Sequence, residues 1–234
     1  MASQRKTTLG DSSLDNLLSR LDVDMVGVAS LADWKGTRLE ETAVKLLPQA
    51  HSVVVLANEV YPEILDLTSP SRVTGEASTS DLMTRHADYL SGRLTKAAYD
   101  VAKASRSAGQ KALPLPAAGC PMDSRVLEAV FSYKHAAQAA GLGKIGWHSL
   151  LITPDFGSRV RLSCCLTEAE LESSNTKTTV ECDGCGICIE NCPASALATP
   201  QTGEPYTINK FACSCFRNAA GTCSECVRVC PLGR

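Results

Sequence analysis

The chain has 234 residues, of which 44% are hydrophobic and 21% are charged, and its formal net charge is −2. This composition allows one good hydrophobic core and a small second module, and it excludes a disordered chain. No apolar run approaches the length of a membrane span, and there is no basic excess. We therefore expect neither a membrane nor a nucleic acid as a partner.

The N-terminal part of the chain predicts alternating helices and strands after a polar tail. In order, we expect a short helix, a strand, a second helix and a strand buried on both faces, at residues 12–21, 24–29, 37–47 and 52–57. The next stretch, residues 61–80, contains Pro62, Pro70, Gly75 and several serines and threonines. We expect it to be a long loop that faces a substrate.

A long helix opens the second part of this region, because apolar residues recur at spacings of three and four over residues 81–107. Pro114 and Pro116 are expected to end any regular element, and a turn follows them. The remaining elements are a helix with Gly141 as its C-terminal stop, a short strand and a half-buried strand, at residues 124–140, 150–152 and 159–166.

Residues 172–179 are polar and lack periodicity, which predicts a domain boundary. We expect an α/β domain at residues 1–172 and a ferredoxin-like module at residues 173–234. The glycine-rich turn at residues 140–146 lies between a helix and a strand. A dinucleotide-binding turn has the strand first, so this order argues against a Rossmann fold.

Eight of the twelve cysteines have the spacing of iron–sulfur ligands. The run from Cys182 to Pro193 reads C-x2-C-x2-C-x3-C-P, which supplies three thiolates to one [4Fe-4S] cube and a fourth to a neighbouring cube. The run from Cys223 to Pro231 repeats the last half of this motif. The pattern therefore predicts two clusters.

The crossed pattern assigns four ligands to each cube. We expect the first cube on Cys182, Cys185, Cys188 and Cys230, and the second on Cys192, Cys223, Cys226 and either Cys213 or Cys215. Structural zinc is an alternative, although its C-x2-C knuckles need neither a third cysteine nor a following proline. A disulfide framework needs an oxidising compartment, and the N-terminal residues lack the apolar core of a signal peptide. We therefore expect a cytoplasmic protein with reduced or metallated cysteines.

Short motifs before the cysteines form a combined pattern: Gly141-Leu142-Gly143, Ile145-Gly146, His148-Ser149-Leu150 and Gly157-Ser158. Together with the cysteine run, and in this order and spacing, they resemble the epoxyqueuosine reductases and the related cobalamin-dependent reductive dehalogenases. Further matches are Leu47-Pro48, Asp88-Tyr89 and Tyr206-Thr207. The last of these matches favours Cys213 over Cys215 as a ligand. The resemblance covers most of residues 20–234.

The resemblance implies a nitroreductase-like α/β domain that holds cobalamin, and two [4Fe-4S] clusters that feed it electrons for a reductive elimination on a small organic substrate. It also implies an electron-donor protein of the ferredoxin or flavodoxin type and is compatible with a homodimer. By position, the corrinoid pocket would be lined by Gly141, Gly143, Gly146, His148, Ser149, Gly157 and Ser158. Small residues let backbone approach a flat macrocycle, and their alternative role is turn formation and sheet packing.

The chain departs from the family pattern around the glycine turn. Lys144 and Trp147 occupy each other's usual positions, and a glutamate usual in the family is replaced by Cys164. The usual acid falls on Leu127, with Asp123 four residues earlier as the nearest substitute. The chain ends four residues after Cys230, so we expect no tRNA-binding helical repeats. These departures argue against epoxyqueuosine as the substrate.

A reduction of this kind needs a proton donor close to the substrate. Our candidates are Tyr133, Asp88 and Asp123; Tyr133 belongs to a Tyr-Lys-His cluster just before the glycine turn, and its alternative role is that of a core tyrosine. Our leading hypothesis is a cobalamin-dependent iron–sulfur reductase. The alternative is a dicluster electron carrier, or a corrinoid-reducing partner protein, with no catalysis of its own.

Overall fold

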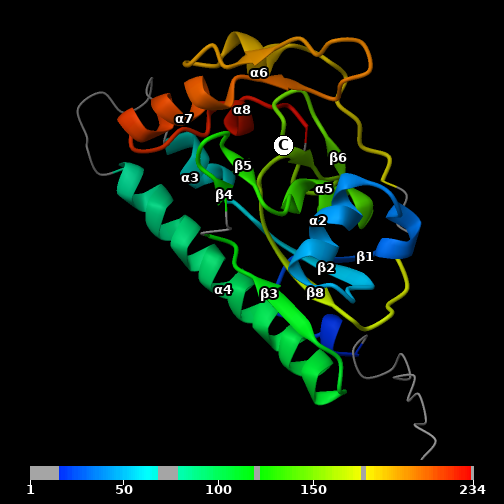
Figure 1. The fold of residues 1–234 in the computed structure, drawn as a ribbon. Helices are drawn as coiled ribbons and strands as arrows, with labels where there is room; N and C mark the ends of the chain where they lie inside the picture. The colour runs from blue at the N-terminus through cyan, green and yellow to red at the C-terminus, as the bar shows by residue number, and fades with distance from the viewer. Residues whose placement is uncertain (1–15, 68–78, 119–121, 175–177, 233–234) are drawn as a thin grey trace, which may run out of the picture.

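The computed structural model describes residues 16–67, 79–118, 122–174 and 178–232. Figure 1 shows an α/β domain with the cysteine-rich module packed across one end of it. The domain is built on a four-stranded antiparallel sheet. In spatial order its strands are β1 (Met25–Ser30), β2 (Ser52–Glu59), β8 (Val160–Thr167) and β3 (Ala112–Leu115). This architecture confirms the predicted mixed α/β class.

Helices cover both faces of the sheet. The long helix α4 (Thr79–Ser107) packs on one face, where its residues Leu94 and Val101 contact Val54 and Leu56 of β2 in one buried cluster. The other face carries η1 (Leu31–Trp34), α2 (Arg38–Leu46) and α5 (Tyr133–Ala139). Because both faces are covered, residues 53–57 of β2 are fully buried, as the continuous apolar run predicts.

The second half of β8 is buried on both faces as well. The prediction of a half-buried strand is wrong there, because α4 packs against one face of β8 and α5 against the other. Cys164 and Leu166 point into the core below α5, whereas Cys165 points toward α4. Burial raises the pKa of the Cys165 thiol to about 12, so this thiol is inert packing.

Residues 62–67 form the helix α3 (Pro62–Leu67), so the expectation of a loop is wrong for this part. Pro62 takes the first helical position, where its missing N–H has no partner to lose. Leu65 is buried with Val60 and Leu90, and Val227 of the cysteine-rich module packs against this cluster. Residues 79–80 begin α4, so the expectation of a loop is wrong for them too, and residues 68–78 lie outside the described residues.

Strand β3 contains Pro114, so the expectation that this proline ends any regular element is also wrong. β3 is an edge strand, and an edge tolerates a residue without an N–H because one side of the strand has no neighbour to pair with. The turn expected after it lies partly at residues 119–121, outside the described residues.

The helix predicted over residues 124–140 begins only at Tyr133. A hairpin of β4 (Met122–Asp123) and β5 (Glu128–Ala129) precedes it, and Val126 and Val130, expected on the buried face, are 48% and 40% exposed. The carboxylate of Asp123 accepts a hydrogen bond from the backbone N–H of Arg125, 3.0 Å away. Such a local side-chain bond stabilises a turn in competition with the helix.

The predicted stop of α5 at Gly141 is confirmed. Gly141 has φ +75°, and the N–H of Leu142 returns to the carbonyl of Ala137 as in a Schellman cap. The chain then forms β6 (Lys144–Ile145), which pairs with β7 (Leu151–Ile152). Gly143 faces the backbone carbonyl of Ile152 so closely that a Cβ would collide with it.

The polar stretch after β8 runs along the free edge of β1. The N–H of Val28 donates to Oγ of Ser174 at 2.9 Å, and the N–H of Ser30 donates to Oγ of Ser173 at 3.1 Å. These serines therefore satisfy donors that the edge strand would otherwise expose to solvent. The division of the chain at residue 172 stays a prediction.

The cysteine-rich module contains short elements only. They are α6 (Ile187–Glu190), β9 (Leu197–Ala198), β10 (Thr207–Ile208), α7 (Lys210–Ala219) and α8 (Glu225–Arg228). β9 pairs with β10, and Asn209 caps α7 by accepting the N–H of Ala212. At the other end of the chain, residues 16–18 of the first predicted helix are helical. Within the described ranges, no helix is both long and apolar enough to cross a membrane.

Gly143→Ala should destabilise the protein by about 1–3 kcal/mol, because the added methyl group overpacks the contact with Ile152. Gly92→Ala is the matched control: it lies on the exposed side of α4 with nothing within 4 Å of its added Cβ. This control should stabilise the helix by about 0.5–1 kcal/mol. Thermal unfolding of the two variants measures the difference, and equal midpoints would contradict the packing described.

Candidate functional site

The first four predicted ligands line one cavity. Cys182, Cys185, Cys188 and Cys230 surround it, together with Trp147 and His148 of the α/β domain. Burial raises the pKa of the Cys188 thiol to about 11, and the charges of the other three cysteines add to this effect. The two runs of chain that carry these thiols therefore meet in one small, partly buried volume.

The second set of four also lies together. Burial raises the pKa of the Cys226 thiol to about 12, with further contributions from Cys223, Cys213 and Cys192 and a smaller one from Cys188. The contribution of Cys188 indicates that the two sets adjoin. Cys213 is partly buried on α7, whereas Cys215, two residues further along the same helix, is exposed.

Neither set is arranged around a single point. Among the residues that the structure describes, no group of three or more His, Cys, Asp or Glu side chains could hold one metal ion. Zinc gathers four thiolates at about 2.3 Å from one ion. A [4Fe-4S] cube distributes them, one to each iron. The assignment of the eight cysteines to two cubes stays a prediction.

Trp147 covers the loop that carries the first cysteines. Gly184 in this loop has φ +71°, and a Cβ there would lie 2.7 Å from Cζ2 of the indole. Lys144, which exchanges places with the tryptophan relative to the family pattern, is exposed. The exchange thus puts an aromatic ring against the cysteine loop and leaves the cation in solvent.

His148 lines the first cavity and Ser158 lines a second one, described below, and both carry buried polar atoms. His148 is only 3% exposed and Ser158 only 5%. Neither Nε2 of His148 nor Oγ of Ser158 has a hydrogen-bond partner in the described structure. Burial, with help from the charge of Lys134, lowers the pKa of His148 to about 4, so its imidazole is neutral. Burial raises the pKa of the Cys230 thiol, and the nearby hydroxyl of Ser158 acts weakly in the opposite direction.

A second cavity, of about 130 Å³, lies between the α/β domain and α8. Its wall is largely apolar, with Val60, Leu65, Val160 and Leu162 on one side and Val227 on the other. Lys134 contributes an ammonium group to it. Ser224 and Val227 in this wall are the direct neighbours of Cys223 and Cys226, so the second cysteine set adjoins the cavity.

Lys134 is held in place by two polar contacts. Its Nζ donates a hydrogen bond to the carbonyl of Ser149 at 2.7 Å and lies 4.1 Å from the ring centroid of Tyr206. Burial lowers its pKa to about 8, and the nearby charge of Lys210 acts in the same direction. The sequence places Lys134 beside Tyr133 but does not show that it enters an apolar cavity.

The three predicted proton donors are not brought together. The hydroxyl of Tyr133 donates to the carbonyl of Pro116 at 2.8 Å, and its ring packs beside that of Phe131, as in the alternative role of a core tyrosine. Asp88 lies on the exposed side of α4. Asp123 lies in the exposed hairpin, where the guanidinium of Arg125 lowers its pKa. None of the three contributes to the wall of the cavity at Lys134.

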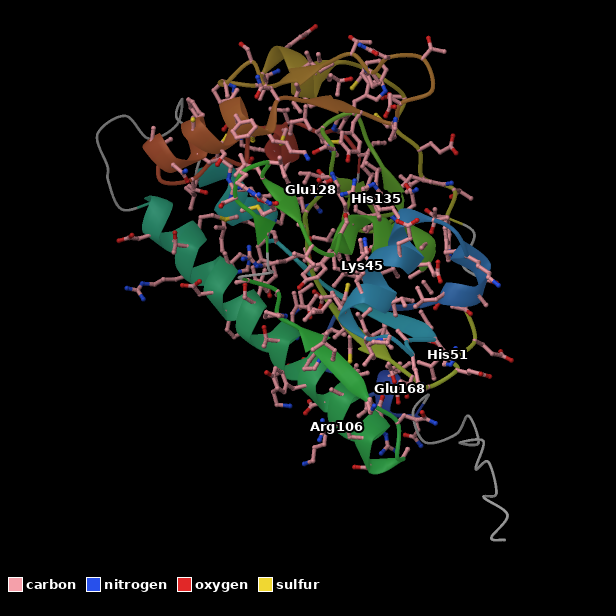
Figure 2. All side chains as sticks on the ribbon, in the orientation of Figure 1. Lys45, His51, Arg106, Glu128, His135 and Glu168 are labelled. Carbon is pink, nitrogen blue, oxygen red and sulfur yellow. The ribbon has the colours of Figure 1, made fainter. Side chains whose placement is uncertain are left out.

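The hairpin itself lies beside the module. Figure 2 shows Glu128 of β5 on the side of the domain next to the cysteine-rich module. Arg106, in the last turn of α4, lies at the far end of the domain from this module. Asp123 pairs with Glu128 in this hairpin, and its carboxylate forms an ion pair with Arg125 on the surface.

The seven residues predicted to line a corrinoid pocket divide among different roles. Gly143 and Gly146 pack against Ile152, and Gly141 and Gly157 adopt positive φ in turns. Of the full set, which also includes His148, Ser149 and Ser158, only Ser158 enters the wall of the second cavity. That cavity is smaller than the roughly 300–1,000 Å³ of pockets for drug-sized ligands and does not enclose a corrinoid.

Comparison with known proteins finds relatives of two kinds. The epoxyqueuosine reductase of Bacillus subtilis (strain 168) is 25% identical over 234 residues, which cover 95% of this chain and 58% of that protein. A tetrachloroethene reductive dehalogenase of Desulfitobacterium hafniense is 31% identical over 161 residues, covering 60% of this chain and 27% of that protein. The chain is a relative of both groups. This relationship confirms the resemblance, although no protein-family model matches the chain.

Solved structures of both groups share the fold. A reductive dehalogenase described with a mechanism for B12-dependent dehalogenation superposes with a TM-score of 0.69 at 18% identity, over 100% of this chain and 34% of that chain. An epoxyqueuosine reductase bound to an epoxyqueuosine-modified tRNA stem loop gives 0.55 at 20% identity, over 94% of this chain and 64% of that one. The expectation that nucleic acid is not a partner stays a prediction for this chain.

Cys213→Ser should lower the iron content of the reconstituted protein by up to one cluster, whereas Cys215→Ser should leave it close to that of the unsubstituted chain. The reason is that Cys213 lies with Cys192, Cys223 and Cys226, while Cys215 is exposed. Iron and acid-labile sulfide analysis after anaerobic reconstitution measures both. Cys188→Ser is the positive control for the first set, and the reverse ranking of the α7 variants would overturn the assignment.

Proposed function

We propose that the chain is an iron–sulfur reductase that passes electrons through two [4Fe-4S] clusters to a small organic substrate. The observation that carries this proposal is the gathering of two adjoining sets of four cysteines beside a cavity that contains a buried ammonium group. The relatives of the chain are named reductases, and this favours an enzyme over a carrier.

Charge supports iron as the occupant of the cysteine sets. Thiolates brought this close repel one another, and burial adds to the cost of ionising Cys188 and Cys226. Cationic iron offsets both effects, since a coordinated thiol is deprotonated. The position of Cys188 near Cys226 would give electrons a short path from the first cluster to the second.

The resemblance also implies cobalamin, and one solved neighbour is described with B12-dependent dehalogenation. When bound, a corrinoid would supply a low-potential carbon- and halide-reactive metal centre. The ammonium of Lys134 and the hydroxyl of Ser158 suit its polar substituents, but the cavity in this structure is too small to enclose it. Cobalamin is therefore a further prediction, and the cavity as described fits a small organic molecule.

The chemistry of the cavity favours an organic acid as that molecule. In the described structure no carboxylate forms an ion pair with Lys134, so its charge is available to an anionic group, while the aliphatic wall suits an apolar body. With a pKa of about 8, Nζ also carries a proton at neutral pH that it can release. The role of proton donor for Tyr133, Asp88 or Asp123 stays a prediction, and the side chains of all three lie outside this wall.

Anaerobic reconstitution should give about eight iron atoms and eight sulfides per chain, because two cubes hold four of each. The same sample, passed through gel filtration after mixing with excess cobalamin, reports corrinoid binding through its visible spectrum. Zinc without iron or sulfide would defeat the proposed function. Eight irons without retained corrinoid would leave the reductase proposal standing and remove cobalamin.

Lys134→Met should weaken the binding of benzoate, used as a small organic anion, by about tenfold, since one charge-assisted contact is lost. In the unsubstituted protein, affinity should fall as pH rises through about 8, because Nζ is charged below its pKa and neutral above it. Lys210, Tyr206 and His148 are the other titratable groups around Nζ. Calorimetric titration with benzoate, and with benzamide as the uncharged ligand, measures this effect. The control variant is Lys144→Met, because the side chain of Lys144 is exposed. Equal pH dependence for both ligands would contradict a role of Lys134.

A further inference from the structure

We propose that His148 donates a hydrogen bond from Nε2 to the first iron–sulfur cluster, or to one of its thiolates, and thereby raises the reduction potential of that cluster. This inference rests on the proposed function, since it needs a cluster on Cys182, Cys185, Cys188 and Cys230. His148 is then a positioning and tuning residue for electron transfer, not a lining residue of a corrinoid pocket.

The backbone determines which ring nitrogen carries the proton. The N–H of Leu150 donates to Nδ1 of His148 at 3.1 Å, so Nδ1 is an acceptor and holds its lone pair toward the chain. A neutral imidazole has one N–H, which must then be on Nε2. The bond from Leu150 also requires the neutral ring, because both nitrogens of an imidazolium are donors.

This Nε2–H group has no acceptor in the described structure. The atom is buried, and the residue is only 3% exposed, so water does not replace the missing partner freely. A buried donor left without a partner costs about 1–3 kcal/mol. The ring lies in the wall of the cavity that the four cysteines surround, and the sulfur atoms of a bound cluster are acceptors.

The ring has little freedom to turn elsewhere. A Cβ at Gly146 would lie 3.1 Å from Cε1 of His148, so the backbone passes close beside the imidazole. The next residue, Ser149, has φ +66°, and its N–H closes a turn onto the carbonyl of Gly146 at 2.8 Å. On the other side of His148, Trp147 packs against Gly184 of the cysteine loop. The loop and the imidazole are therefore fixed relative to each other.

Ser158 provides an independent observation of the same kind. Its Oγ is also buried without a hydrogen-bond partner in the described residues, and it lies near Cys230, the ligand from the far end of the chain. Two neutral donors from the α/β domain thus approach one cysteine set. Reduction adds negative charge to a cluster, and donors to its sulfur atoms stabilise the reduced form, so they raise its potential.

Two substitutions distinguish the role of Nδ1 from that of Nε2. In His148→Asn, the amide oxygen can replace Nδ1 as acceptor of the Leu150 N–H, but no donor reaches the position of Nε2. In His148→Gln, the longer amide can place an N–H near that position. The measurement is a redox titration of the holoprotein, monitored by electron paramagnetic resonance. In His148→Asn the potential of the first cluster should be more negative by about 59 mV, which is about tenfold in the equilibrium constant of a one-electron reduction. His148→Gln should stay closer to the unsubstituted protein.

The second cluster is the internal reference, because His148 does not line its cysteine set. Electron–nuclear double resonance of the reduced first cluster should also lose one exchangeable-proton coupling in His148→Asn. An unchanged potential and an unchanged coupling in a protein that holds both clusters would overturn this inference alone. A protein without clusters would instead overturn the proposed function, and iron analysis of the same sample distinguishes the two results.

Discussion

Eight thiol groups brought into a small volume repel one another when they ionise, and this repulsion is the constraint on which the rest of the structure depends. The pKa values of Cys188 and Cys226 are raised strongly, because each thiol is at least partly buried. Cys188 also lies near three other cysteines, and Cys226 lies near four. The module around them has only short helices and paired dipeptide strands, so it has little core of its own. The proposed iron–sulfur clusters would replace that core and neutralise the thiolates.

The segment between α5 and β7 serves both cavities. Its glycines let the chain turn tightly against Ile152, which leaves Trp147 and His148 on the side of the first cysteine set. The helix just before the turn directs Lys134 into the second cavity. One short stretch thus connects a proposed electron-transfer centre to a proposed substrate site, and the motif that the family shares owes much of its glycine content to packing.

Local sequence patterns predicted the long elements well and the surface hairpin poorly. The apolar periods of α4 and β2 agree with their structure because both elements bury a complete stripe or two complete faces. The valines before Tyr133 have helical spacing but no core to pack against. A hairpin forms there instead of a helix, and the carboxylate of Asp123 stabilises its turn. α3 was missed because its six residues contain a single buried leucine, whose partners come from distant segments.

The sequence by itself determined the number and order of the cysteines, and with them the prediction of two clusters with crossed ligands, because ligand spacing is a property of short loops. It also determined the mixed α/β class and the family relationship. Only the tertiary structure placed Lys134 in an apolar cavity and aligned His148 with the first cysteine set. The physical reason is that burial and unpaired donors depend on which distant segments pack together, and no local pattern encodes those neighbours.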